Sequence, residues 1–147
     1  MKISTKGRYA LRVLIDLAEN GGEGPVSLSA ISVRQGISKK YLEQIIPLLN
    51  SAGMLQTNRG ARGGYRLSKT PADYTVGEIL RVTEGNIAPV SCLEGADNPC
   101  ERNGACDVLY IWQGLYEVME NYLDRISIQD ILDRKRRKRE RDDIVLL

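Results

Sequence analysis

Apolar residues recur every three or four positions in three segments of the first third of the chain. This spacing is typical of helices that bury one face. The predicted helices cover residues 5–20, 28–36 and 39–52. Ser27 and Ser38 are suitable N-caps for the second and third helices, and Gly36 ends the second. Pro47 falls inside the third helix and should bend it, because proline removes one backbone donor.

The pattern then changes to that of two short strands. Residues 54–58 and 65–67 have strand composition, and the glycine-rich turn 59–64 joins them. Two helices followed by a hairpin is the order of a winged helix-turn-helix, whose second helix can lie in a DNA major groove. We therefore expect a mainly α fold with a small β-hairpin wing.

Helical spacing returns in the second half of the chain. Thr75 and Glu78 form a capping-box pattern at the start of a fourth helix. Further helices are predicted over residues 75–82, 107–125 and 127–133. The expected parts are a winged helix-turn-helix DNA-binding lobe at 1–84, a cysteine loop at 85–106, dimerisation helices at 107–133 and a basic, disordered tail at 134–147.

Charge is divided unevenly along the chain, although the net charge is only +2. Residues 1–69 hold 11 Lys and Arg against 4 Asp and Glu, whereas residues 70–133 hold 3 against 12. Residues 134–141 hold 7 against 1. A basic first part predicts a polyanionic partner, and an acidic middle would repel one.

Double-stranded DNA is the polyanion that a winged helix would bind. The first turn of the third helix offers groups that suit phosphates: Ser38, Lys39, Lys40 and Tyr41. Glu43 and Gln44 follow, where a carboxylate can accept from cytosine and an amide can pair with adenine. Arg59 and Arg62 on the glycine-rich turn can enter a minor groove.

Three cysteines carry the other candidate chemistry. Cys92, Cys100 and Cys106 follow the spacing C-x7-C-x5-C in a chain that has no histidine. Thiolates suit iron–sulfur clusters, zinc or copper, and this spacing does not separate them. Three redox-active free thiols are the alternative. Clustered thiols without an export signal indicate a reducing cytoplasm.

The remaining composition excludes several classes of protein. The sequence has no histidine, no P-loop and no G-x-S-x-G motif, so an enzyme with a small-molecule substrate is not expected. No segment approaches the roughly 20 apolar residues that span a bilayer, so no membrane contact is expected.

Three segments closely resemble the IscR-type (IscR/NsrR-like) winged-helix regulators of bacteria: STKGRYAL, ISVRQGISKKYLEQI and NRGARGGYRLSK. The cysteine loop and the following Trp-bearing helix are also similar, so the likeness covers about residues 1–133. It implies a homodimer joined by the long C-terminal helix. From the apolar pattern of that helix we assign Trp112 and Tyr116 to the side that meets the second subunit; the alternative is that the whole apolar face is intramolecular core. The family's recognition and wing positions correspond to Tyr41, Glu43, Gln44, Arg59 and Gly60.

The resemblance also implies that the three cysteines bind an iron–sulfur cluster, with two-iron two-sulfur expected and four-iron four-sulfur as the alternative. Relatives add a histidine three residues after the last cysteine, or a carboxylate near position eight of the partner chain. Leu109 and Arg8 occupy these positions here, and neither can ligate. Glu101 and Asp107 are the candidates for a fourth ligand because they adjoin cysteines.

The sequence thus predicts a cytoplasmic, homodimeric transcriptional repressor. It would bind an operator in double-stranded DNA and sense iron–sulfur cluster status, redox or nitrosative stress through its cysteines. The alternative is a winged-helix regulator without a cluster. Such a protein would act by thiol oxidation, zinc or a protein partner, for example in the control of cysteine metabolism.

Overall fold

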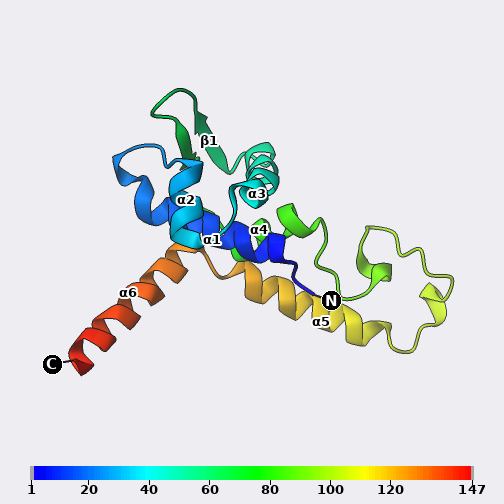
Figure 1. Ribbon diagram of the computed structural model, residues 1–147. Helices are drawn as coiled ribbons and strands as arrows, with labels where there is room; N and C mark the ends of the chain where they lie inside the picture. The colour runs from blue at the N-terminus through cyan, green and yellow to red at the C-terminus, as the bar shows by residue number, and fades with distance from the viewer. Residues whose placement is uncertain (1, 147) are drawn as a thin grey trace.

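The computed structural model describes residues 2–146, which form helices and one two-stranded antiparallel sheet (Figure 1). The elements are α1 (Thr5–Asn20), α2 (Leu28–Gln35), α3 (Lys39–Ser51), β1 (Leu55–Asn58), β2 (Gly64–Leu67), α4 (Val76–Glu84), α5 (Leu109–Asp124) and α6 (Ile128–Val145). The hairpin rises from one side of a lobe built by α1 to α4, and α5 and α6 leave this lobe in different directions. The predicted order of helix pair and wing is confirmed.

Side-chain caps fix where the helices of the lobe begin. The Ser27 hydroxyl accepts from the Ala30 amide at 3.1 Å, and the Ser38 hydroxyl accepts from the Tyr41 amide at 3.2 Å. Gly36 ends α2 in the left-handed conformation, with φ of 62°. Each of the two serine N-caps contributes about 1 kcal/mol relative to alanine. The chain therefore enters α3 at Ser38, which determines the side chains of its first turn.

α1 lies at the centre of the main core and contacts α2, α3, α4, α6 and the hairpin. Its buried apolar side is formed by Ala10, Val13, Leu14 and Leu17. Burying one such large side chain stabilises the fold by about 1.5–3 kcal/mol. A second, smaller cluster of Val76, Leu80 and Ile87 joins α4 to α5. The core thus holds the winged lobe together and fixes the base of α5.

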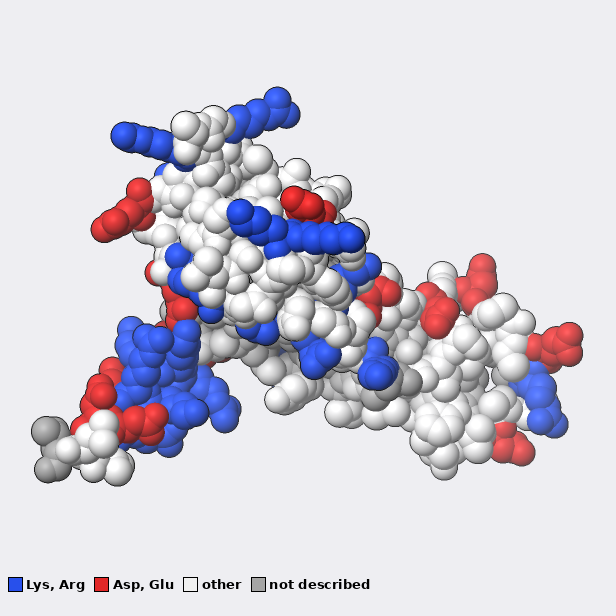
Figure 2. All heavy atoms as spheres, viewed as in Figure 1, with Lys and Arg blue, Asp and Glu red and all other residues white. Residues whose placement is uncertain are grey.

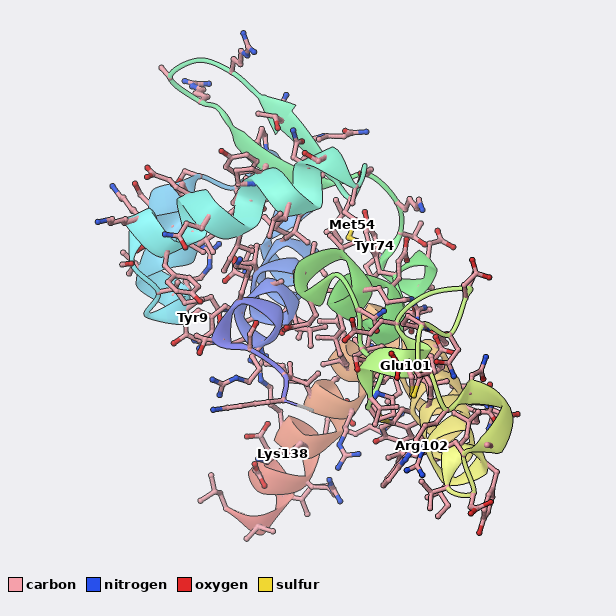
Figure 3. All side chains as sticks on the ribbon, turned by 90° about the vertical axis from the view of Figure 1, so that its right-hand side faces the viewer. Tyr9, Met54, Tyr74, Glu101, Arg102 and Lys138 are labelled. Carbon is pink, nitrogen blue, oxygen red and sulfur yellow. The ribbon has the colours of Figure 1, made fainter. Side chains whose placement is uncertain are left out.

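Tyr74 attaches the wing to this core. Its ring is fully buried, and its hydroxyl donates to the Met54 carbonyl at 2.7 Å and accepts from the Lys69 amide at 3.0 Å (Figure 3). On the other side of the hairpin, Tyr65 pairs with Val26 through backbone bonds of 2.8 and 2.9 Å. Tyr74 therefore holds the base of the hairpin, and the bridge to Val26 holds β2 close to the turn.

α6 differs from the predicted tail. We expected a short helix to residue 133 and disorder from 134 to 147, whereas α6 continues to Val145. Ser127 and Asp130 form a complete capping box, and Ile128 is fully buried against the lobe. Arginine, lysine and glutamate are strong helix formers, so a well-anchored first turn extends into the basic segment.

The bounds predicted for α3 and α5 lie within two residues of the observed ones. α5 begins at Leu109, two residues later than expected. α3 continues past Pro47, which lies on its exposed side. Among the helices of residues 2–146, none has the length and apolar character required to cross a membrane.

Candidate nucleic-acid interface and cysteine loop

The start of α3 exposes the side chains that the sequence assigns to DNA. Leu42, Ile45 and Leu49 are fully buried and hold one side of α3 against the lobe. The other side exposes Ser38, Lys39, Lys40, Glu43 and Gln44. Because the buried side fixes the rotation of the helix, the exposed residues present one constant face that a groove can accept.

Tyr41, which the sequence also assigns to DNA contact, is half-buried. Its ring meets that of Tyr9 on α1 edge to face, with centroids 5.3 Å apart. The Arg12 guanidinium lies 5.1 Å from the centroid of the Tyr9 ring. An aromatic pair of this geometry contributes about 0.5–1.5 kcal/mol. The contact links α3 directly to the first turns of α1.

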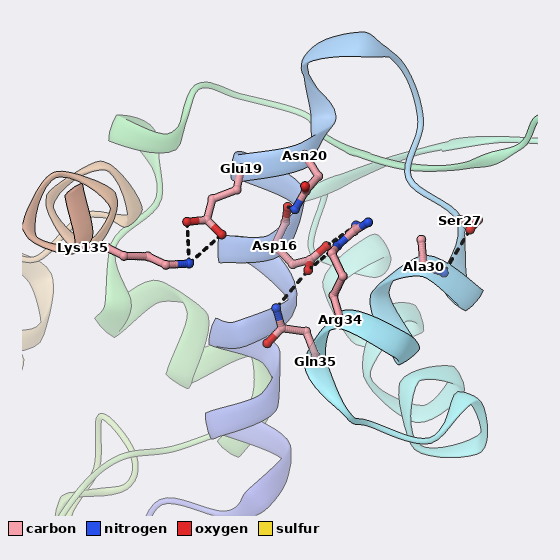
Figure 4. A network of polar contacts seen from close by, with 8 residues as sticks. All are labelled: Asp16, Glu19, Asn20, Ser27, Ala30, Arg34, Gln35 and Lys135. Atoms are coloured by element: carbon pink, nitrogen blue, oxygen red, sulfur yellow. Dashed lines mark hydrogen bonds and ion pairs between the residues drawn. The ribbon is translucent and has the colours of Figure 1, made fainter. Parts of the chain in front are cut away.

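A buried carboxylate sets the position of the helix pair. Asp16 is only 1% exposed, and Arg34 donates to both of its oxygens, at 2.9 and 2.7 Å (Figure 4). Gln35 donates a third bond at 2.9 Å. The bond with Asp16 raises the pKa of Arg34 above its ordinary value. This network fastens α2 to α1, and through the turn after Gly36 it also orients α3.

The wing presents two arginines on a thin turn. Arg59 and Arg62 are both exposed, and Figure 2 shows basic side chains projecting from the tip of the hairpin. Gly60 between them has a φ of 105°, a conformation that favours glycine. Its carbonyl accepts from the Gly63 amide at 2.9 Å, which closes the turn. A turn with so few bulky side chains can approach a narrow groove closely.

The outer face of α5 leaves large apolar side chains in solvent. Tyr110, Val118 and Tyr122 are 71%, 67% and 66% exposed. Tyr116 does not belong to this face, which corrects its assignment to a second subunit: it packs against the Val76–Leu80–Ile87 cluster. Burial there, reinforced by Glu120, raises the pKa of Tyr116.

The cysteines lie in the long connection between α4 and α5. In space this connection loops outward beyond the N-terminal end of α5 before it turns back into that helix (Figure 1). Cys92 and Cys106 are half-buried, Cys100 is exposed, and all three are free thiols. Local bonds shape the connection, including one of 2.9 Å from the Cys100 amide to the Asn98 side chain. Solvent and small reagents can therefore reach this loop.

The thiols are not gathered into a metal site. Over residues 2–146, no three Cys, His, Asp or Glu side chains are grouped so as to hold a metal ion. Glu101 and Asp107 are exposed, Leu109 opens α5, and the Arg8 guanidinium donates to Thr5 at 3.0 Å. Thiolate sulfur is a suitable ligand for iron. The three cysteines are fewer than the four ligands that usually hold an iron–sulfur cluster, and they are not grouped around one point. A bound group would require the loop to fold around it.

The base of the cysteine loop is joined to the start of α1. Glu84, the last residue of α4, accepts from the Ser4 amide at 3.0 Å and from the Ser4 hydroxyl at 2.7 Å. The loop follows directly after Gly85, and Tyr9 lies one turn into α1. Loop, α1 and α3 are therefore connected by the Glu84–Ser4 and Tyr9–Tyr41 contacts.

The chain matches a known protein family over nearly its whole length. The sequence profile of the Rrf2 family, described as an iron-dependent transcriptional regulator, matches residues 3–134. This chain belongs to the Rrf2 family. It is therefore a DNA-binding transcriptional regulator rather than an enzyme.

Two named relatives illustrate the similarity of this Rrf2 regulator to other proteins. The transcriptional regulator CymR of Bacillus subtilis (strain 168) is 41% identical over 131 residues, which is 89% of each chain. The transcriptional regulator IscR of Aliivibrio salmonicida is 36% identical over 132 residues, 90% of this chain and 77% of the relative.

Solved structures agree with the sequence relatives. CymR, the global cysteine regulator of B. subtilis, superposes with a TM-score of 0.72 at 40% identity and covers 89% of this chain and 95% of its own. The IscR of T. potens also gives 0.72, at 39% identity, and covers 92% and 88%. The predicted family and fold are confirmed.

Sequence reasoning missed the residues that position α3 in the Rrf2 regulator. Asp16 lies among the apolar positions of α1, where an unpaired carboxylate would be costly. That conflict was the available signal for a buried partner such as Arg34. Tyr9 and Arg12 gave no comparable signal, because exposed aromatic and basic residues are common on helices.

Proposed function

We propose that this Rrf2 regulator reads operator DNA with the exposed start of α3 and with the wing. The main support is the division of α3 into a fully buried side and an exposed side that carries the polar residues. The residues that contact DNA in this proposal are Ser38, Lys39, Tyr41, Glu43, Gln44, Arg59, Gly60 and Arg62. Phosphate contacts fix position, while Glu43 and Gln44 select bases.

We further propose that the protein works as a homodimer on the chromosome, in the cytoplasm, and represses transcription. The exposed apolar face of α5 supports an isologous contact with a second copy, because Tyr110, Val118 and Tyr122 would otherwise remain in water. Two recognition helices related by a two-fold axis would contact two half-sites one helical turn, or a multiple of it, apart.

The signal that we propose is an iron–sulfur cluster on Cys92, Cys100 and Cys106. The family description and the similarity to IscR proteins support it, as do three accessible thiols in one loop. When bound, a cluster supplies a soft-ligand iron centre that oxidants or nitric oxide can attack. We favour the two-iron form, keep the four-iron form as the alternative, and keep Glu101 and Asp107 as candidate fourth ligands.

Iron and sulfide content after anaerobic purification tests the cluster. We expect about two irons and two sulfides per chain, or about four of each for the larger form. Mössbauer and EPR spectra assign the nuclearity, and the Cys92→Ala variant should lose the iron. Protein that contains no iron under these conditions would contradict the proposal.

A second candidate function is a regulator without a cluster, controlled by thiol oxidation, zinc or a protein partner. Two observations favour it: the cysteines do not converge within residues 2–146, and a structural neighbour is a cysteine regulator. In this case the anaerobic protein is colourless. Its DNA affinity then changes on mild thiol oxidation or on addition of a cysteine-metabolism protein, and Cys100→Ser, the exposed thiol, reduces the oxidation response.

A further inference from the structure

α6 presents a row of cations on one face. Arg134, Arg137, Lys138 and Arg141 are spaced three or four residues apart along the helix, so they share a side, and all four are exposed. We call this set the basic stripe. Arg134, Arg137 and Arg141 border one surface hollow, together with Glu140 and Ile144. The stripe is thus a basic surface about two turns long, with Glu140 at its border.

The ion pairs of α6 involve other residues than the stripe. Lys135 pairs with Glu19 of α1 at 2.6 Å, and Arg136 pairs with Asp133 at 3.3 Å. None of the ion pairs found within residues 2–146 includes a member of the basic stripe. One side of α6 therefore fastens the helix to the lobe, while the stripe retains its charge for a partner.

α6 is also held at a fixed angle to the lobe. The Ile128 amide donates to the Tyr74 carbonyl at 3.0 Å, and Ile131 and Leu132 pack against the main core. Beyond this anchored part the helix projects into solvent, and Lys138 stands out from it in Figure 3. Figure 2 shows the basic surface of α6 well apart from the hairpin tip and the start of α3. The stripe is therefore a separate basic surface.

We propose that the basic stripe binds the phosphate backbone of operator DNA outside the half-site that α3 contacts. This inference rests on the proposed DNA reading, because it adds contacts to the same duplex. Arginine forks fit phosphate oxygens, and the middle of the chain is acidic and would repel DNA without such contacts. The stripe is about 10 Å long, enough to follow about three nucleotides of one strand.

Matched double variants test the stripe on DNA of two lengths. An operator is first selected from a random duplex library and trimmed to the half-sites whose base sequence the selection fixes. A second duplex extends it by about 10 bp, one helical turn, on each side. Arg137→Gln with Arg141→Gln alters the stripe, and Arg136→Gln with Arg139→Gln removes the same charge from the other side of α6. Circular dichroism checks that both variants keep their helix content.

We expect the wild-type protein to bind the extended duplex more tightly and with a steeper salt dependence. The stripe variant should lose about tenfold in affinity for the extended duplex, and its slope of log affinity against log salt should fall by about two per chain. The control variant should change by less than half as much.

Two results would overturn the inference: an equal loss of affinity in the stripe and control variants, or a wild-type salt slope in the stripe variant. Either result would leave the proposed reading of the half-site by α3 intact. If the wild-type protein does not bind the trimmed duplex selectively, the proposed reading of DNA by α3 fails, and this inference with it.

Discussion

Single side chains on α3 divide the proposed recognition between position and sequence. Lys39 and Gln44 are both exposed and lie within two turns of the same helix. A lysine at the first turn attracts phosphates of any sequence, whereas an amide one turn later can pair with one base. The two residues therefore offer a direct comparison within one element.

Gln44→Ala should weaken DNA binding on the selected operator by about 1–3 kcal/mol and much less on unrelated duplexes. Lys39→Ala should weaken binding on all sequences and lower the salt slope by about one. Fluorescence anisotropy on selected and scrambled duplexes measures both effects. Equal losses on every sequence for both variants would contradict the assignment of Gln44 to a base.

The Asp16–Arg34 pair gives an asymmetric prediction. Asp16 is 1% exposed while the Arg34 side chain is 39% exposed, so removal of the arginine leaves a buried charge and removal of the aspartate does not. Arg34→Ala should lower the free energy of unfolding by about 2–3 kcal/mol. In urea denaturation the double variant with Asp16→Ala should be no less stable than Arg34→Ala alone. Additive losses would show that the two residues act independently.

At the scale of elements, local signals predicted most helices and failed at one. Ser27, Ser38 and Gly36 mark the ends of α2 and α3 because caps act within a few residues. The length of α6 depends on the packing of Ile128 against the lobe and on the Lys135–Glu19 pair, which join residues far apart in sequence. Charge composition alone therefore indicated a solvated tail.

The cap of α6 makes part of its stability depend on pH. The Ser127 amide and hydroxyl both donate to Asp130 at 2.8 Å, and these bonds lower the pKa of the carboxyl. When the pKa of a carboxyl is lower in the folded chain than in the unfolded chain, its ionised form stabilises the fold at pH values above the unfolded-state pKa. That stabilisation is lost as the pH falls through the folded-state pKa. The contribution should therefore begin to decrease as the pH falls below about 4.

Asp130→Asn should lower the thermal midpoint at pH 6, and the difference from wild type should shrink as the pH falls below about 4. Thermal melts followed by circular dichroism across this range measure it. Asp142→Asn, in the last turn of the same helix, is the control and should raise the midpoint, because an anion there opposes the helix dipole. A pH-independent difference for Asp130→Asn would contradict the role of its charge.

On the scale of the whole molecule, the winged lobe carries four separate surfaces. The proposed DNA face lies on α3 and the wing, the apolar face lies on α5, the cysteine loop lies between α4 and α5, and the basic stripe lies on α6. Local patterns in the sequence predicted the cysteine loop and the exposed start of α3. They assigned Tyr116 to the wrong side of α5, because helical spacing does not say which side meets the lobe. The sequence could not predict whether the thiols converge, because that depends on how the loop folds and on what it binds.

Val118→Glu should convert the proposed dimer to a monomer at micromolar concentration, because it places a charge in the apolar contact that we propose. Val33→Glu is the matched control: Val33 is 83% exposed on α2, away from α5, and the same substitution should leave the dimer intact. Analytical ultracentrifugation distinguishes these states. Neither variant should unfold the chain, since both side chains are already in water. Dimers in both variants would place the subunit contact elsewhere.

Trp112 is the only tryptophan in the chain and is half-buried on α5, six residues after Cys106. It lies in the first turn of the helix that carries the apolar face and that follows the cysteine loop. Its fluorescence is therefore an intrinsic optical reporter: pairing of subunits should shift the emission to shorter wavelength, and an iron centre in the loop should quench it. Changes in the loop and at the interface can thus be followed in the native protein, in real time and without an attached dye.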